Sequence, residues 1–280
     1  MIRALARGYD RPMTAIASRP PVGAMLREWR QRRRLSQFDL ALQAGISSRH
    51  LSFVETGRAR PSAEMVLHIA EELDVPLRDR NHLLLAAGYA PVFGQPELDA
   101  PEMGPVRDAI DQVLRGHEPF PALVVDSHWG LVAANRAFGP LVDGVAEHLL
   151  APPVNVLRLS LHPEGLAPRI LNLYQWRAHL LERLARDALT SADPALTVLH
   201  DELASYPDGG PGQQLDPAFG DVAVPLRLRH DETELAFIST KTTFGTAIDV
   251  TVAELSIESF FPADPQTSKA MHSLVGAWSA

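Results

Sequence analysis

Residues 36–60 read SQFDLALQAGISSRHLSFVETGRAR, and this stretch decides the fold of the first part of the chain. Ser36 suits a helix N-cap, and Asp39 three positions later completes a capping-box-like start. Gly45 stands where this helix would end in the left-handed conformation, and Ser47 can cap a second helix. Two short helices joined at a glycine, the second with short polar side chains near its start, are typical of a helix-turn-helix that enters the major groove of DNA.

The same stretch resembles the phage-repressor-like helix-turn-helix domains of the XRE family. The positions that fit the family pattern in register are Gln37, Ala41, Gly45, Ile46-Ser47, Leu51-Ser52, Val54-Glu55, Gly57 and Pro61. The resemblance implies a five-helix repressor-like domain over residues 20–90. Such domains bind double-stranded operator DNA as one half of a homodimer, because they read paired half-sites about one helical turn apart.

The resemblance also assigns roles to individual residues. Ser36 and Gln37 begin the first motif helix, where main-chain N–H groups and a side-chain amide would meet a phosphate. Arg49 would donate a bidentate pair of hydrogen bonds to a guanine edge. Arg30 and Glu55 match a buried ion pair that links the first helix to the second motif helix. The groove-facing positions would be Ser47, Ser48, Arg49 and Phe53, and the phosphate-holding positions beyond them Thr56, Arg58 and Arg60.

Charge is distributed very unevenly along the 280 residues. The net charge is −8, yet residues 1–60 hold 12 arginines and 4 acids, a net of +8. The other 220 residues hold the remaining 14 basic and 30 acidic groups, a net of −16. This asymmetry indicates a polyanion-binding end and a body that does not bind polyanions.

Several classes of protein are excluded or disfavoured. There is no cysteine, which excludes disulfides, thiolate nucleophiles and cysteine metal sites. No run approaches 18 consecutive apolar residues, so we expect no membrane span and a cytoplasmic protein. Residues 1–19 contain four arginines but no apolar core of signal-peptide length, and we expect them to form a mobile arm.

The second part of the chain has a different pattern. Residues 91–105 are rich in proline and glycine and predict a linker, and a short helix over 106–115 follows. Strands are predicted over 121–126 and 131–135, then a helical block over 136–205. Three strand-like runs close the chain, over 222–230, 234–244 and 249–261, with a hairpin at Asp231-Glu232. Two strands, several helices and three strands are the order of a PAS-type domain, with a five-stranded antiparallel sheet and helices over one face.

This part, residues 106–275, resembles the MmyB-like (MltR-type) ligand-binding domain of transcription regulators. The matching segments are VVDSHWGLVAANRAF (124–138), NVLRLSLHPEG (155–165), WRAHLLER (176–183) and FISTKTTFGTAIDVTVAELSIESFFPAD (237–264). The resemblance implies a PAS-like α+β fold after a repressor-like helix-turn-helix, and a lipid-like or other small apolar ligand. Helix–sheet gaps are common ligand cavities. Candidate ligand contacts are Asn135, Tyr174, Trp176, His179, Thr243 and Phe244.

No catalytic or metal motif supports an enzyme. HExxH, GxSxG, a Walker loop and a GxGxxG after a strand are all missing, and His162-Pro163-Glu164 lacks the cysteine pair of a zinc deaminase. We therefore expect no catalytic residue, no metal and no cofactor other than a bound fatty acid or similar apolar molecule. The resulting hypothesis is a bacterial DNA-binding regulator that senses a small molecule. The alternatives are an enzyme with an appended helix-turn-helix domain and a DNA-binding protein whose second domain only dimerises.

Overall fold

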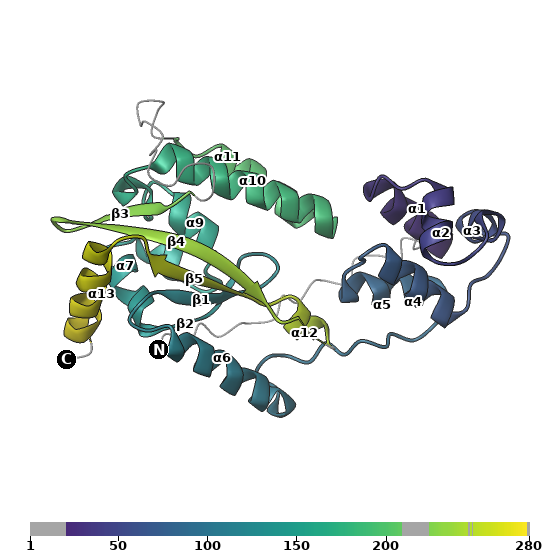
Figure 1. Cartoon of the computed structure of the whole chain (residues 1–280), viewed down its shortest axis with the longest axis horizontal. Coiled ribbons are helices and arrows are strands. Elements are labelled where there is room, and N and C mark those ends of the chain that lie inside the picture. Colours follow the sequence, from purple (N-terminus) through teal and green to yellow (C-terminus); the bar gives the residue numbers. More distant parts are fainter. Residues whose placement is uncertain (1–20, 209–223, 246, 248, 279–280) are drawn as a thin grey trace.

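The computed structural model describes residues 21–208, 224–245, 247 and 249–278. Within these residues the chain forms a helical first part and a second part in which helices surround a sheet (Figure 1). This is the two-part α+β architecture predicted from the sequence. The arm expected over residues 1–19 lies outside the described residues. No described helix combines the length and the apolar character needed to cross a membrane.

From residue 21 onward, where the structure describes the chain, five helices build the first part around an apolar core. They are α1 (Val22–Arg32), α2 (Gln37–Gln43), α3 (Ser48–Glu55), α4 (Ala63–Glu72) and α5 (Leu77–Ala86). The core contains the fully buried side chains of Leu26, Leu40, Leu51, Ile69 and Leu83.

The turn between α2 and α3 has the chemistry that the sequence indicates. Ser36 and Asp39 form a reciprocal capping box at the start of α2, and the Ser47 hydroxyl accepts the His50 N–H at the start of α3. Gly45 has a φ of +63°, a conformation in which a side chain on Cβ would be strained. These three features set the angle between α2 and α3.

The described residues of the second part form a five-stranded antiparallel sheet in the order β2-β1-β5-β4-β3. The strands are β1 (Ala122–Val125), β2 (Leu131–Ala134), β3 (Leu226–His230), β4 (Thr233–Thr243) and β5 (Ser256–Pro262). The helices are α6 (Gly104–Gly116), α7 (Gly139–Val142), α8 (Glu147–Leu150), α9 (Val156–Leu161), α10 (Leu173–Ser191), α11 (Pro194–Ala204), α12 (Val250–Ala253) and α13 (Pro265–Trp278). Short 3₁₀ turns lie at Pro101–Met103, Arg136–Phe138 and Ala167–Arg169.

The two faces of the sheet have separate cores, because successive strand residues point to opposite sides. On one face Ala122, Val124 and Ile257 pack against α6. On the other face Leu123 and Phe237 belong to a larger core that includes residues of α7, α9, α10, α11 and α13. The longest helix, α10, lies over this second face (Figure 1).

One predicted strand is wrong over part of its length. The run 249–261 does not begin as a strand, because the Asp249 side chain accepts the Val252 N–H at 2.8 Å and caps the helical turn α12. Strand β5 begins only at Ser256. The alternation of Val250 and Val252 with polar residues imitates a strand, and both valines are buried in the turn instead.

The segment after α5 is held by both parts of the chain. Asn81 accepts the N–H groups of Val92 and Phe93 at 3.1 Å and donates to the Phe93 carbonyl at 2.8 Å. Further along, Val250 N–H donates to the Gly94 carbonyl at 2.9 Å, and the Thr251 hydroxyl donates to the Pro96 carbonyl at 2.6 Å. The segment predicted as a linker is thus an extended stretch of chain that is hydrogen-bonded to Asn81 of α5 and to residues of α12.

Candidate functional site

Helix α3 presents a polar outer face. Its Leu51, Val54 and Glu55 are buried against the domain, so the rest of its circumference points outward. Arg49 is exposed, and its guanidinium carbon lies 5.3 Å from the centre of the Phe53 ring. Ser47, Ser48, Phe53, Thr56 and Arg58 are exposed or half-buried around it. This face combines hydroxyl, guanidinium and aromatic groups, and Arg58 is exposed just beyond the end of the helix.

A buried ion pair holds α3 against α1. Arg30 Nε and Nη2 donate to the two carboxylate oxygens of Glu55 at 2.6 and 2.9 Å, and both side chains are buried. Arg30 Nη1 also donates to the Leu35 carbonyl at 2.8 Å. The hydrogen bond that Arg30 donates to Glu55 is the main reason that the pKa of Arg30 is raised. The bidentate geometry fixes the rotation of α3 relative to α1.

Two residues expected to meet phosphates are engaged within the protein. The Gln37 amide donates to Glu55 Oε2 at 2.7 Å, so its side chain joins the pair of Arg30 and Glu55. Arg60 Nη2 donates to the Ala87 carbonyl at 3.1 Å, and the guanidinium lies over the Tyr89 ring. Each of these two side chains therefore has a partner within the fold, and its contact with a phosphate stays a prediction.

The second part holds an apolar cavity between the sheet and α9 and α10. Its volume is about 70 Å³. It is lined by Pro121, Leu123, Trp129, Phe138, Leu141, Val156, Leu157, Leu159, Ser160, Leu166, Trp176, Leu180, Arg183, Leu226, Leu228, Ser239, Glu258 and Phe260. Small-molecule sites commonly measure about 300–1,000 Å³. A ligand of ordinary size would therefore have to move α9 or α10 away from the sheet.

Two charged side chains lie together at one place in the wall of the apolar cavity. Arg183 on α10 donates through both terminal nitrogens to the carboxylate of Glu258 on β5, and the two side chains are only 14% and 5% exposed. The Arg183 guanidinium also lies 4.6 Å from the centre of the Trp129 ring. This pair ties the helix layer to the sheet.

Of the six predicted ligand contacts, only Trp176 lines the apolar cavity. Its indole N–H donates to the Ser160 hydroxyl at 3.0 Å. His179 is not in the cavity lining but stacks on the Trp176 ring. Burial is the main reason that the pKa of its imidazole is lowered, and the charges of Arg183 and Arg186 add to the effect. Tyr174 is 46% exposed on the outer side of α10.

The other three predicted ligand contacts lie outside the lining of the apolar cavity. Thr243 is exposed near the end of β4, and Phe244 packs against the core under α6, on the face away from the cavity. Asn135 is buried, but its side chain accepts the Ala122 N–H and donates to the Leu114 and Phe120 carbonyls. Asn135 therefore links α6 to the sheet through hydrogen bonds. The strand register that separates the two faces of the sheet could not be read from the sequence.

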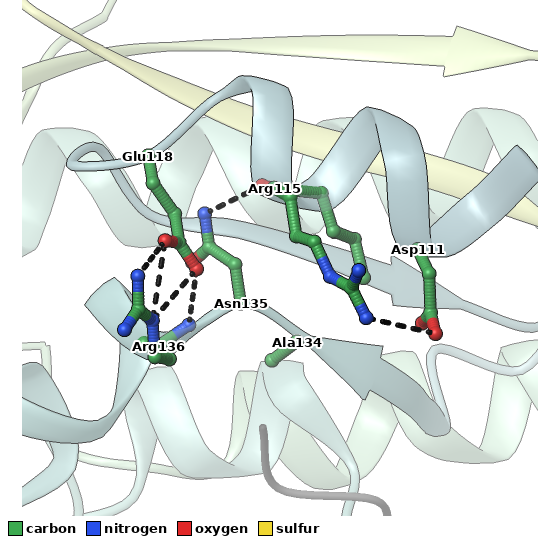
Figure 2. A pocket seen from close by; sticks show the side chains of 7 residues that line it. Asp111, Arg115, Glu118, Ala134, Asn135 and Arg136 are labelled. Atoms are coloured by element: carbon green, nitrogen blue, oxygen red, sulfur yellow. Dashed lines mark hydrogen bonds and ion pairs between the residues drawn. The ribbon is translucent and has the colours of Figure 1, made fainter. Parts of the chain in front are cut away.

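A second, more polar hollow of about 290 Å³ lies beside α6 (Figure 2). Asp111, Leu114, Arg115, Glu118, Ala134, Asn135 and Arg136 line it. Arg136 donates to Glu118 at 2.6 Å, and this bond is the main cause of the lowered pKa of Glu118. The charges in this larger hollow neutralise one another and its apolar wall is small, so the smaller cavity is the better candidate for an apolar ligand.

One group of possible metal ligands occurs among the described residues: His148, His162 and Glu164. The Glu164 N–H donates to His162 Nδ1 at 3.1 Å, which leaves the proton of a neutral imidazole on Nε2. Neither ring nitrogen of His162 then offers a free lone pair. The group does not meet the donor requirement of a metal site as it is arranged.

Residues 106–274, more than half of the chain, match the model of the MmyB-like transcription regulator ligand binding domain. The chain belongs to this family. Residues 21–83 match a helix-turn-helix domain model. The chain is also similar to the uncharacterized HTH-type transcriptional regulator RghRB of Bacillus subtilis (strain 168). The identity is 36% over 83 residues, which are 29% of this chain and 58% of that relative. The chain therefore matches less than two thirds of the relative's length.

Proposed function

We propose that this protein is a sequence-specific DNA-binding transcription regulator whose second part senses a small apolar, lipid-like ligand. The proposal divides the chain into a DNA-binding domain over 20–90, a linker over 91–105 and a ligand-binding domain over 106–275. One observation carries it: the elements that line the apolar cavity also extend to the contacts with the helix-turn-helix part. The family and the exposed face of α3 support the DNA-binding role. Action as a homodimer belongs to the same proposal, because helix-turn-helix domains of this kind read paired half-sites.

Helix α10 is the first of these elements. Trp176, Leu180 and Arg183 on α10 line the apolar cavity. At the other end of this helix, the Thr190 carbonyl lies 3.5 Å from the Arg33 guanidinium, which also donates to the Leu73 carbonyl at 2.8 Å. If a ligand displaced α10, the contact between Thr190 and Arg33, which directly follows α1, would therefore change.

Strand β5 is the second element. Its Glu258 and Phe260 line the apolar cavity, and α12 directly precedes it. Glu254, which ends α12, accepts two hydrogen bonds from Arg78 on α5 at 2.6 and 2.7 Å. A ligand that binds one arrangement of α10 and β5 more tightly would thus also favour one position of the DNA-binding domain.

The cavity chemistry disfavours the enzyme alternative. Among the residues that line the cavity, the titratable groups are Arg183 and Glu258, and each is already bound to the other. A nucleophile beside a general base, the usual arrangement for covalent or acid–base catalysis, does not occur in this lining. A domain that served only for dimerisation would not need a largely apolar cavity with a polar pair in its wall.

The pair between Arg78 and Glu254 provides a test of the coupling route. We expect Glu254→Gln to reduce the factor by which an alkanoic acid changes operator affinity, because the interdomain contact then loses its charge. Ligand affinity in the absence of DNA should change little. Asp249 caps α12 and is unsuitable as a control, so the matched control is Glu232→Gln on the exposed β3–β4 turn. If this factor, measured by fluorescence anisotropy, is unchanged, the contact between Arg78 and Glu254 does not transmit the effect of the ligand to the DNA-binding domain.

Base reading by α3 is tested at Arg49. Arg49→Ala should weaken binding to the selected operator by about 1–3 kcal/mol, the usual loss of a bidentate arginine–guanine contact. Binding to a scrambled duplex should weaken much less. Arg80→Ala on α5, outside the motif helices, serves as the charge-matched control. Equal losses on operator and scrambled DNA for Arg49→Ala would mean that Arg49 contacts phosphates only.

The proposed function as a whole is tested by the molecules that the protein retains. We expect mass spectrometry of organic extracts from natively purified protein to detect a bound lipid-like species, in an amount that scales with the protein. Removing it should change operator affinity, and adding it back should restore the first value. Retention without any effect on operator affinity would leave lipid binding but contradict sensing.

A further inference from the structure

Phe53 is an aromatic residue of α3 whose ring does not belong to the core of the first part. Among the described residues, that core and the partly buried apolar side chains packed against it include residues of all five helices, and Phe53 is not one of them. Leu51 and Val54 on the same helix are fully buried, whereas Phe53 is half-buried. An apolar side chain at the surface needs no functional explanation by itself. The contacts of the Phe53 ring therefore decide whether it has a role.

The ring contacts Arg49, one helical turn earlier on the same outer face. The Arg49 guanidinium carbon lies over the Phe53 ring at 5.3 Å from its centre, which is within the range of a cation–π interaction. Helical side chains lean toward the N-terminus of their helix, so Phe53 covers the turn that contains Arg49. Arg49 forms no ion pair with a carboxylate in the part of the chain that the structure describes. Its N–H donors are therefore not taken up by an acid and can meet a base edge.

The distance between the two groups fits neighbouring base pairs rather than a single one. A guanidinium that donates two hydrogen bonds to the O6 and N7 atoms of a guanine lies close to the plane of that base. Successive base pairs are stacked about 3.4 Å apart along the DNA axis. A ring that lies under the guanidinium, with its centre 5.3 Å away, is therefore beside the next base pair. The apolar group that a base edge offers in the major groove is the C5-methyl of thymine.

The backbone that carries the ring is fixed on both sides. Its neighbours Leu51 and Val54 are anchored in the core. The Phe53 carbonyl accepts the N–H groups of Arg58 at 2.8 Å and Ala59 at 3.0 Å. Arg58, which we expect to hold a phosphate, is thus attached through its main chain to the residue that carries the ring. The position of the ring along the groove is therefore tied to the position of the domain on the DNA backbone.

From this arrangement we propose that Arg49 and Phe53 act as one unit that reads two adjacent base pairs. Arg49 donates to a guanine, and Phe53 contacts the methyl group of a thymine in the next base pair. Phe53 is also a positioning residue for Arg49, because its ring restricts the guanidinium before DNA arrives. Part of the side-chain entropy that a free arginine loses on docking is then lost already in the free protein. This inference rests on the proposed function, which requires only that α3 reads bases.

The first test selects duplexes from a random-sequence pool with the full chain and its variants. We expect the wild-type sequences to contain a guanine and, in the adjacent base pair, a thymine on either strand. Phe53→Ala should lose the preference for this thymine and reduce the preference for the guanine several-fold. Phe53→Tyr keeps the ring and should retain both preferences. Phe38→Ala removes a 66% exposed ring from α2 and is the matched control, with unchanged preferences. Selection of the same sequences by Phe53→Ala and wild type would overturn the proposal.

The second test exchanges that thymine for uracil, which removes the methyl group and changes nothing in the protein. Burial of one such carbon group corresponds to about fourfold in affinity, so wild type should bind the uracil duplex about fourfold more weakly. Phe53→Ala should bind the thymine and uracil duplexes equally well. Equal binding of both duplexes by wild type would overturn the contact between Phe53 and thymine.

A double-mutant cycle tests the positioning role. On the operator, the combined loss in Arg49→Ala/Phe53→Ala should be smaller than the product of the two single losses by about two- to fivefold, the size of a cation–π contact at an exposed site. On a scrambled duplex the single effects should multiply. Because the Phe53 ring lies outside the core, Phe53→Ala should melt close to the wild-type temperature, which separates positioning from a loss of folding. Effects that also multiply on the operator would overturn the positioning role while the proposed function stands. A wild type that selects no sequence from the pool would contradict the proposed function itself.

Discussion

Glu55→Gln should lower the free energy of unfolding of the helix-turn-helix part by about 3–5 kcal/mol. The physical reason is that glutamine leaves the Arg30 guanidinium without a counter-charge in a place where little water reaches it. The Glu55 side chain is 1% exposed and that of Arg30 is 10% exposed, so solvent screens the loss very little. Gln37 loses a charged acceptor in the same substitution. This is the largest single-residue effect on stability that we expect in the first part of the chain.

Differential scanning calorimetry of the full chain can follow this change, because the two parts have separate cores and should show separable transitions. Glu71→Gln, an exposed glutamate on α4, is the matched control. The transition of the second part should stay at its wild-type temperature in both variants. A shift in Glu55→Gln no larger than that in Glu71→Gln would show that the ion pair contributes no more than a surface charge.

Lengthening an alkanoic acid from eight to twelve carbons should tighten its binding by at most about 3 kcal/mol, close to 200-fold. Burial of each methylene contributes about 0.8 kcal/mol, and four methylenes are added. The gain should stop once the chain fills the space that α9 and α10 can open. Because the cavity measures about 70 Å³, each added methylene must also push the helices further from the sheet. The slope per methylene therefore reports how easily that movement occurs.

Isothermal titration calorimetry with acids of increasing length measures this slope. Leu180→Phe on α10 should weaken binding of every acid, because overpacking a filled wall typically costs about 1–3 kcal/mol. Leu189→Phe places the same change on the same helix at a 74% exposed position and should have no effect. Affinity that is independent of chain length, or equally affected by both variants, would mean that the acids do not bind in the apolar cavity.

The helix-turn-helix part could be predicted almost completely, because its signals are local. Caps at Ser36 and Ser47 and the left-handed Gly45 depend on neighbours within four residues, and the structure has all three. The sequence could not show which side chains that suit a phosphate also bind a partner within the protein. Gln37 and Arg60 suit a phosphate, and within the fold they also donate to Glu55 and to the Ala87 carbonyl.

The ligand residues were harder to predict, because their positions depend on sheet register and layer order. Phe244 and Trp176 look alike as aromatic pocket candidates, yet they lie on opposite faces of the sheet. Arg183, Glu258 and Trp129 were missed. One signal for Glu258 was present: an acid in a strand that also carries Ile257 and Phe260 is expensive to bury and therefore indicates a partner or a site. Its partner on α10 lies 75 positions away, which no local pattern reveals.

The central claim is that ligand and operator binding are coupled, and the most direct test measures both affinities on one sample. An operator duplex is first selected from a random-sequence pool. Operator affinity is then measured by fluorescence anisotropy with and without saturating decanoate, and decanoate affinity by calorimetry with and without the duplex. Thermodynamic linkage requires that the two factors be equal, and we expect a factor of about 5 to 150. Saturable decanoate binding with the same operator affinity in its presence and absence would contradict the account.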